Sequence, residues 1–159
     1  MISQQQLKEL LHYDPDTGVF TWIRRRRGTR FGHSAGRLNH GYVSIRVLGR
    51  EYGAHRLAWL YMTGRWPADQ IDHKNCIRNN NRWDNLREAD YSLNQQNRKS
   101  APSNNRTTGL LGVRPRGKRF MAKIMLNGEV HYLGTFDTPQ LAHGAYLDGK
   151  RRLHPGCTI

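Results

Sequence analysis

The sequence predicts an α+β fold, with short helices and strands in residues 1–99 and a three-stranded antiparallel sheet with one helix in residues 109–159. Three observations predict it. Runs of β-branched and aromatic residues between turn residues indicate strands, and apolar residues at helical spacing indicate short helices. The polar stretch 100–108 has no apolar periodicity, which is typical of a linker between two units.

The opening segment is predicted to be a helix followed by a strand. Residues 2–12 begin with a capping box formed by Ser3 and Gln6, and Ile2 is placed to pack on Leu7. Turn residues at 14–18 then lead into a strand over 19–23.

A hairpin and a second helix are predicted next. Residues 41–47 and 51–53 indicate two strands joined by a turn at 48–50. The following segment, 54–62, has apolar residues at helical spacing and ends at Gly64.

The charge predicts a polyanionic partner. The chain carries 26 Lys and Arg against 12 Asp and Glu, a net charge of +14, and both parts of the chain are basic. Double-stranded DNA is the partner we expect. No basic amphipathic helix favours a membrane surface, and the C-terminal sheet lacks the exposed aromatic pairs expected for stacking on RNA bases. With no signal peptide and no apolar run near the ~20 residues of a membrane span, we expect a cytoplasmic protein.

The sharpest concentration of charge is a run of four arginines with a fifth nearby: Arg24, Arg25, Arg26, Arg27 and Arg30. Adjacent like charges repel one another unless an anion gathers them. We predict phosphate contact here, and the alternative is a solvated hairpin tip.

Residues 71–99 carry the candidate chemistry. Asp72 and His73 are adjacent, and Asn85 and Asn94 follow. A carboxylate and a carboxamide supply the oxygen ligands that suit a hard cation such as Mg²⁺, and an imidazole beside them can deprotonate water. The residues alone leave two interpretations open, a one-metal hydrolytic site and a solvated polar loop.

The order and spacing of these residues resemble the HNH nuclease motif. Asn85 lies twelve positions after His73, and Asn94 lies nine further on. More narrowly, the stretch resembles the phage and intron homing endonucleases. That branch has an HRL-aromatic element similar to residues 54–59, and some phage HNH proteins have a leader similar to residues 13–22. The resemblance implies a ββα-metal fold, in which two antiparallel strands and a helix clasp one divalent cation.

The resemblance also implies a role for each position. Asp72 and Asn94 would bind Mg²⁺, for which Mn²⁺ can substitute. His73 would be the general base that activates water. Asn85 would hold the long turn in register and orient His73.

The chain departs from the family pattern at one position in the loop. Where the family has a glycine shortly after the acid-base pair, this chain has Cys76. Glycine takes positive φ without penalty and cysteine does not, so we expect the loop to turn differently, through Asn75. A capping box at Ser92 and Gln95 then predicts the start of the helix that carries Asn94.

Three further residues near the motif are candidates. Arg56 and Arg98 are predicted to contact the DNA backbone, because a guanidinium suits anion contact. His55 has two interpretations, a group of the site and a helix cap or core residue.

The C-terminal part has strand, turn and helix signals. Strands are predicted over 110–114, 120–126 and 130–133, with a hairpin turn at Asn127 and Gly128. Thr138 and Pro139 begin a helix. Its predicted apolar face consists of Leu141, Ala142, Ala145, Tyr146 and Gly149.

This part resembles the ethylene-response-factor type of DNA-binding domain, through residues 112–114, 120–124, 132–138 and 142–146. The resemblance implies that one sheet face lies in the major groove, where arginine can read guanine. The residues expected to contact DNA are Arg114, Arg116, Arg119 and Lys123. Tyr132 either joins them or is a core aromatic under the helix.

Two functions follow from these patterns. The first is a metal-dependent DNA endonuclease of the homing type, acting in a phage-infected bacterial host. The alternative is a non-catalytic, sequence-preferring DNA-binding protein. The presence of the acid, the imidazole and both amides together favours the enzyme. One such centre cuts one strand, so a monomer is expected to nick DNA and a weak dimer to cut both strands.

Overall fold

The computed structural model describes residues 1–25, 31–98, 100–101, 105 and 107–154. It divides into two compact units, Met1–Asp90 and Tyr91–Ile159. Residues 91–98 therefore group with the second unit, whereas the sequence placed the end of the first part at residue 99. The functional boundaries at 99 and 109 stay a prediction.

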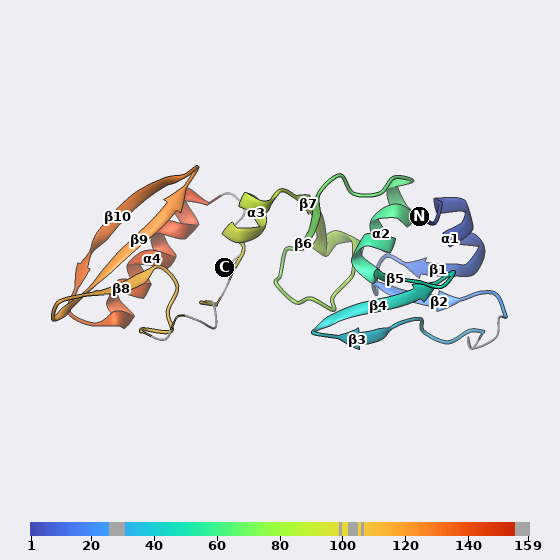
Figure 1. The fold of residues 1–159 in the computed structure, drawn as a ribbon, viewed down its shortest axis with the longest axis horizontal. Coiled ribbons are helices and arrows are strands. Elements are labelled where there is room, and N and C mark those ends of the chain that lie inside the picture. Colours follow the sequence, from blue (N-terminus) through green and yellow to red (C-terminus); the bar gives the residue numbers. More distant parts are fainter. Residues whose placement is uncertain (26–30, 99, 102–104, 106, 155–159) are drawn as a thin grey trace. The chain divides into compact units, whose positions relative to one another are not determined.

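The described residues of the first unit form three small antiparallel sheets and two helices (Figure 1). Its elements are α1 (Gln4–Leu10), β1 (Leu11–Asp14), β2 (Val19–Trp22), β3 (Arg37–Asn39), β4 (Tyr42–Val47), β5 (Arg50–Gly53), α2 (Ala54–Thr63), β6 (Gln70–His73), the 3-10 turn η1 (Trp83–Asn85) and β7 (Leu86–Ala89). The sheets have the strand orders β1-β2, β3-β4-β5 and β6-β7.

The start of α1 is as predicted, but its end is not. Ser3 Oγ accepts a hydrogen bond from the Gln6 backbone at 3.1 Å, and Gln6 Oε1 accepts one from the Ser3 backbone at 3.0 Å. The helix stops at Leu10 rather than continuing to residue 12, because Leu11 begins a strand paired with Trp22. The strand pairing buries Leu11 just as a helix face would, so the apolar pattern alone did not distinguish the two.

The hairpin prediction at 48–50 is confirmed, and its turn is tight. Leu48 and Gly49 both have positive φ, +50° and +82°, which is typical of a two-residue type I′ turn. The third strand of this sheet, β3, was not predicted, because all three of its residues are exposed and carry no apolar alternation. The predicted helix is α2, and Gly64 ends it at a φ of +78°.

The leader formed by β1 and β2 supports the long loop that follows β6. The Tyr13 hydroxyl donates to the Asn81 carbonyl at 2.6 Å, and the Trp83 backbone donates to the Pro15 carbonyl at 2.9 Å. Gly18, in the turn between β1 and β2, lies so close to this loop that an added Cβ would sit 2.4 Å from the Asn81 carbonyl carbon. The leader thus fixes the loop from outside.

The second unit is a three-stranded antiparallel sheet with α4 on one face (Figure 1). Its elements are α3 (Tyr91–Gln96), β8 (Val113–Arg116), β9 (Arg119–Leu126), β10 (Glu129–Phe136) and α4 (Pro139–Leu153), with strand order β10-β9-β8. Its core consists of Val113, Ala122, Ile124, Ala142 and Tyr146. The predicted turn is present, with Asn127 and Gly128 at φ of +51° and +86°.

Three details of the second unit differ from expectation. β8 begins at Val113 rather than residue 110. Leu141 was assigned to the apolar face of the last helix, but it is exposed, because Ala142 and Tyr146 point at the sheet instead. α3 begins at Tyr91, one residue before the expected Ser92, although Asn94 still lies in its first turn.

None of the helices formed by the described residues combines the length and apolar content needed to cross a bilayer.

The close approach of Gly18 gives a stability prediction with a matched control. Gly18→Ala should lower the free energy of unfolding by about 2–4 kcal/mol, because a left-handed φ of +74° and a backbone clash act together. Gly49→Ala has a similar φ of +82° with nothing within 4 Å, so it should cost only about 1–2 kcal/mol. Urea unfolding measures both, and equal losses would contradict the packing of the leader on the loop.

Candidate functional site

The strand pair β6-β7 positions the acid and the imidazole. Asp72 pairs with Arg87, and His73 pairs with Leu86 at the end of β6. Both side chains are buried, and His73 is only 5% exposed. The alternative of a solvated polar loop therefore does not describe these two residues.

Asn85 closes the loop between the two strands. Its Oδ1 accepts from the Asn75 backbone at 3.0 Å, and its Nδ2 donates to the Asn80 carbonyl at 2.7 Å. The Asn85 backbone carbonyl also accepts from the Lys74 backbone at 2.9 Å. One amide side chain thus joins both ends of a twelve-residue loop.

The loop turns at Cys76 itself, which corrects the sequence expectation. Cys76 has a φ of +61°, so it adopts the left-handed conformation that the family assigns to glycine. The turn is kept because local hydrogen bonds fix it: Cys76 N donates to the His73 carbonyl at 2.8 Å, and Ile77 N donates to Asn75 Oδ1 at 2.9 Å. Cys76 therefore keeps a strained left-handed backbone, and the hydrogen bonds of the turn offset the strain.

A residue that sequence reasoning missed is bonded to the imidazole. His73 Nε2 lies 3.0 Å from Oδ1 of Asn81, which is only 2% exposed. The sequence assigned the orienting role to Asn85, whose side-chain bonds go to Asn75 and Asn80 instead. Asn81 belongs to a run of three asparagines, and only its hydrogen bonds distinguish it from its neighbours.

Two more rings surround the His73 imidazole. The His55 ring lies 5.4 Å from it, centroid to centroid, and Tyr42 lies 5.5 Å from His55 and 6.0 Å from His73. His55 Nδ1 is buried without a hydrogen-bond partner. Of the two interpretations of His55, the structure therefore favours a place beside the candidate base.

A cation lies next to this aromatic group. The Arg78 guanidinium carbon is 5.2 Å from the centroid of the Tyr42 ring, and Arg78 is exposed at the surface. Neither Tyr42 nor Arg78 belongs to the motif spacing, so sequence reasoning missed both.

The surroundings keep both imidazoles neutral. Burial lowers the pKa of His73, and Arg78 acts in the same direction, while the Asn81 hydrogen bond and Asp72 oppose the shift. Burial, with His73 and Arg56 as weaker causes, lowers the pKa of His55 to about 4. At neutral pH both rings therefore carry a lone pair that can accept a proton.

Asp72 is held by an ion pair. Arg87 Nε and Arg87 Nη2 approach Asp72 Oδ2 at 3.0 and 2.7 Å. Both contacts involve Oδ2. Among the described residues no three His, Cys, Asp or Glu side chains gather as a metal cluster. The donor types that the sequence proposes, one carboxylate and one amide, still fit a hard cation.

The remaining predicted residues are more scattered. Asn94 is half-buried on α3, in the second unit. Arg56 Nη1 donates to the Asp69 carbonyl at 3.1 Å, so its guanidinium has a structural contact. Arg24, Arg25 and Arg98 are exposed. The run's other members, Arg26, Arg27 and Arg30, lie outside the described residues.

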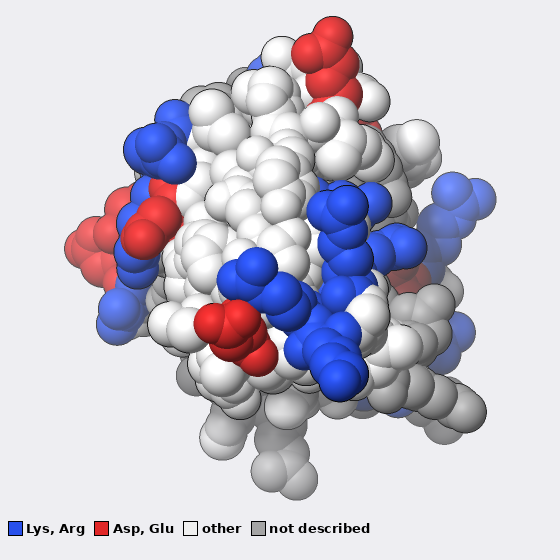
Figure 2. Space-filling model, turned by 90° about the vertical axis from the view of Figure 1, so that its left-hand side faces the viewer, with Lys and Arg blue, Asp and Glu red and all other residues white. Residues whose placement is uncertain are grey.

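The open face of the second unit gathers basic side chains. In the register of β8 and β9, Arg114 pairs with Met121, on the side opposite the buried Ala122, and Lys123 lies two residues further along the same face. Arg114, Arg116 and Lys123 have no ion-pair partner among the described residues, whereas Arg119 pairs with Asp137 at 2.8 Å. Figure 2 looks onto this side of the molecule and shows basic side chains beside a band of uncharged ones.

Tyr132 belongs to the same open face. It pairs with Lys123 across β9 and β10, is exposed, and its hydroxyl lies 2.6 Å from Thr135 Oγ1. The interpretation of Tyr132 as a core aromatic under the helix is wrong.

The left-handed Cys76 predicts a stabilising substitution. Cys76→Gly should raise the free energy of unfolding by about 0.5–1 kcal/mol, because relief of the φ strain outweighs the entropy that glycine adds to the unfolded chain. Cys76→Ala keeps the strain and should give no gain. Chemical denaturation of the three proteins checks this, and an equal gain for both variants would contradict the assignment.

The depressed pKa of His55 predicts a loss of stability in mild acid. The folded pKa of about 4 lies below the ordinary 6.5, so the unfolded chain binds more protons between these values. The contribution of neutral His55 to the free energy of unfolding is therefore fully present above pH 6.5, and it is lost as the pH falls towards 4. From pH 7 to pH 5 the loss attributable to His55 should be about 1–2 kcal/mol.

The variant His55→Phe keeps a ring at this position and cannot titrate. Its free energy of unfolding, measured in urea at both pH values, should fall less than that of the parent protein. An NMR titration of the parent should place the His55 pKa near 4. A normal pKa for His55 would show that the ring is accessible to solvent.

Comparison with known proteins identifies part of the chain. Residues 52–96 match the family model described as HNH endonuclease. No curated protein and no solved structure matches the chain. The matched range begins in β5, contains the Asp72-His73 pair and ends with α3. The chain thus contains an HNH endonuclease domain at residues 52–96.

Proposed function

We propose that the HNH endonuclease domain at residues 52–96 makes this protein a DNA endonuclease that hydrolyses phosphodiester bonds. The observation that carries the proposal is the buried imidazole of His73, which lies beside Asp72 and is hydrogen-bonded to Asn81. A general base must be able to accept a proton at the working pH and must lie within reach of the attacking water. The lowered pKa of His73 and its hydrogen bond to Asn81 support this role.

The hydrogen bond to Asn81 determines which nitrogen would act. Because Asn81 Oδ1 is an acceptor, Nε2 of the neutral ring carries the proton. Nδ1 then has the lone pair and would take a proton from the attacking water. A water deprotonated in this way can add to phosphorus in line with the leaving oxygen. Asn81 is thus proposed as the positioning residue for His73. Asn85 holds the loop that carries Asn81.

Arg78 would contribute positive charge at the same place. Its guanidinium lies over the Tyr42 ring, which itself contacts His73. A cation held in this position attracts the phosphate and stabilises the extra negative charge of the transition state. It also disfavours protonation of His73, which keeps the base in its active form.

Asp72 and Asn94 are proposed as the ligands of one divalent cation, Mg²⁺ with Mn²⁺ as a substitute. Such an ion would supply charge neutralisation at the phosphate oxygens. The Asp72 carboxylate would bind the cation, and Arg87 would keep this carboxylate oriented through its hydrogen bond to Oδ2. The pairing of Asp72 with Asn94 rests on the motif spacing.

The second unit is proposed to bind the DNA duplex through its open sheet face. Arg114, Arg116 and Lys123, which have no ion-pair partner in the part of the chain that the structure describes, support this, because they lie on the face that α4 leaves uncovered. Arg119 would contribute less, since Asp137 already neutralises it. In the first unit, the exposed Arg24 and Arg25 would add phosphate contacts.

The finer assignment is a homing-type enzyme of a phage or intron, acting as a monomer that nicks or as a weak dimer that cuts both strands. It rests on the resemblance of the leader and of residues 54–59, as does the ethylene-response-factor-like assignment of the second unit. The alternative is a DNA-binding protein without catalysis. The buried, bonded state of His73 favours the enzyme, because a binding protein has no need to keep a neutral imidazole beside a carboxylate.

The base is tested by substitution of His73. With Mg²⁺, the protein should convert supercoiled plasmid to nicked or linear forms, and a chelator should stop it. His73→Ala should lower the cleavage rate by about 10²–10⁴, because a positioned base contributes that much. DNA binding, measured by gel shift without the metal, should be unchanged.

The exposed His12 supplies a control, since His12→Ala removes an imidazole without touching the site. Cleavage by His73→Ala at the parental rate would rule out His73 as the base. Failure of the parent protein to cut any plasmid, with binding intact, would favour the non-catalytic alternative.

A further inference from the structure

The open face of the second unit carries exposed apolar side chains as well as cations. Met125, Val130 and Tyr132 are 63%, 55% and 57% exposed. Single exposed apolar residues are common on protein surfaces, but a group on one face indicates an interaction site. These three are neighbours, because Val130 pairs with Met125 and Tyr132 pairs with Lys123 in the β9-β10 register.

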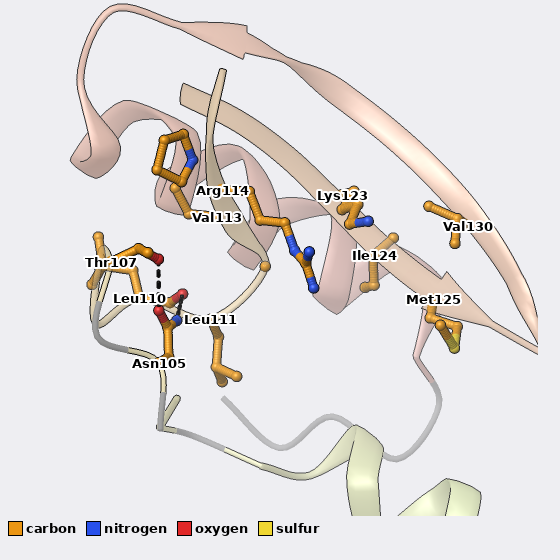
Figure 3. Close-up of a pocket in the computed structure, with 12 residues that line it drawn as sticks. Asn105, Thr107, Leu110, Leu111, Val113, Arg114, Lys123, Ile124, Met125 and Val130 are labelled. Carbon is orange, nitrogen blue, oxygen red and sulfur yellow. Dashed lines mark hydrogen bonds between the residues drawn. The ribbon is translucent and has the colours of Figure 1, made fainter. Parts of the chain in front are cut away.

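Met125 and Val130 border a hollow that extends from the open face toward the core residues Val113 and Ile124. A hollow of about 750 Å³ lies between the sheet and the loop that precedes β8, and Met125, Val130, Lys123 and Arg114 line it (Figure 3). Figure 3 shows Arg114 projecting into the space beside the loop, with Lys123, Met125 and Val130 on the strands further along. Cationic and apolar groups therefore meet in one hollow.

The occupant of this face must be anionic and must also carry apolar groups. The major groove of DNA meets both requirements, and it admits a β-ribbon. Its phosphates and guanine edges suit Arg114 and Lys123. Its one apolar group is the C5 methyl of thymine, which projects from the base edge into the groove.

We infer that Met125 and Val130 read thymine, by packing on its methyl group while the cations of the same face hold the DNA. The inference rests on the proposed DNA binding of the second unit and assigns it a base preference. Glutamine or threonine at these two positions would keep the side-chain size but lose the apolar contact. Position-specific selection for A·T pairs thus comes from side chains that make no hydrogen bond.

Uracil provides a direct probe, because it differs from thymine only by the missing methyl group. Two pools of random 40-base-pair duplexes are prepared, one with thymine and one with uracil throughout. Binding of the full chain is measured in a chelator, so that no cleavage occurs. The thymine pool should bind about threefold to fivefold more tightly for each methyl group that is buried.

Variants separate the methyl contact from other effects of uracil on the duplex. The double variant Met125→Gln, Val130→Thr should bind both pools equally, with its affinity for the uracil pool unchanged from the parent. Arg114→Ala should weaken both pools alike and reduce the salt dependence of binding. Leu141→Gln removes an exposed apolar side chain from α4 and should keep the preference for thymine.

The outcomes distinguish this inference from the proposed function. Equal, salt-sensitive binding of both pools by the parent overturns the thymine contact and leaves DNA binding intact. If the double variant still prefers thymine, the preference comes from another surface, and the inference is overturned as well. Absence of binding to either pool overturns both. Stronger binding to anionic phospholipid vesicles than to DNA would identify the face as a membrane site and overturn the inference as well.

Discussion

The site depends on one physical constraint: a twelve-residue polar loop must be held in a single conformation between two four-residue strands. Apolar burial alone cannot do this, because most of the loop's side chains are polar and Trp83 is its one side chain that packs against the hydrophobic core among the described residues. Side-chain amides do it instead. Asn85 bonds to both ends of the loop, and Asn81 connects it to the imidazole of His73. Each bond satisfies a backbone or ring group that burial would otherwise leave unpaired.

The leader completes this arrangement from outside the motif. Tyr13 donates to the backbone of Asn81, and Gly18 allows the turn between β1 and β2 to touch the same segment. The first ninety residues are therefore one structural unit around the loop, with α1, α2 and the sheets sharing a single core. The leader thus constrains Asn81, the residue that is hydrogen-bonded to the His73 imidazole.

The two faces of the sheet in the second unit differ in what they carry. One face of its sheet packs on α4 through Ala122, Ile124 and Tyr146, and this small core holds the unit together. The other face is left with cations and apolar side chains that contribute nothing to that core. A sheet with alternating side chains produces this division directly, because neighbouring residues point to opposite sides.

Local patterns determined much of this protein without the structure. The capping box of α1, the hairpin turns at 48–49 and 127–128 and the cap of α4 all depend on neighbours within a few residues, so the sequence predicts them. Contacts between distant segments were decided only by the tertiary structure. The boundary between α1 and β1, the choice of Asn81 among three asparagines and the place of His55 beside His73 each depend on partners elsewhere in the chain. Chemically identical residues acquire different roles through such contacts, because only folding determines which of them is buried and which partner it meets.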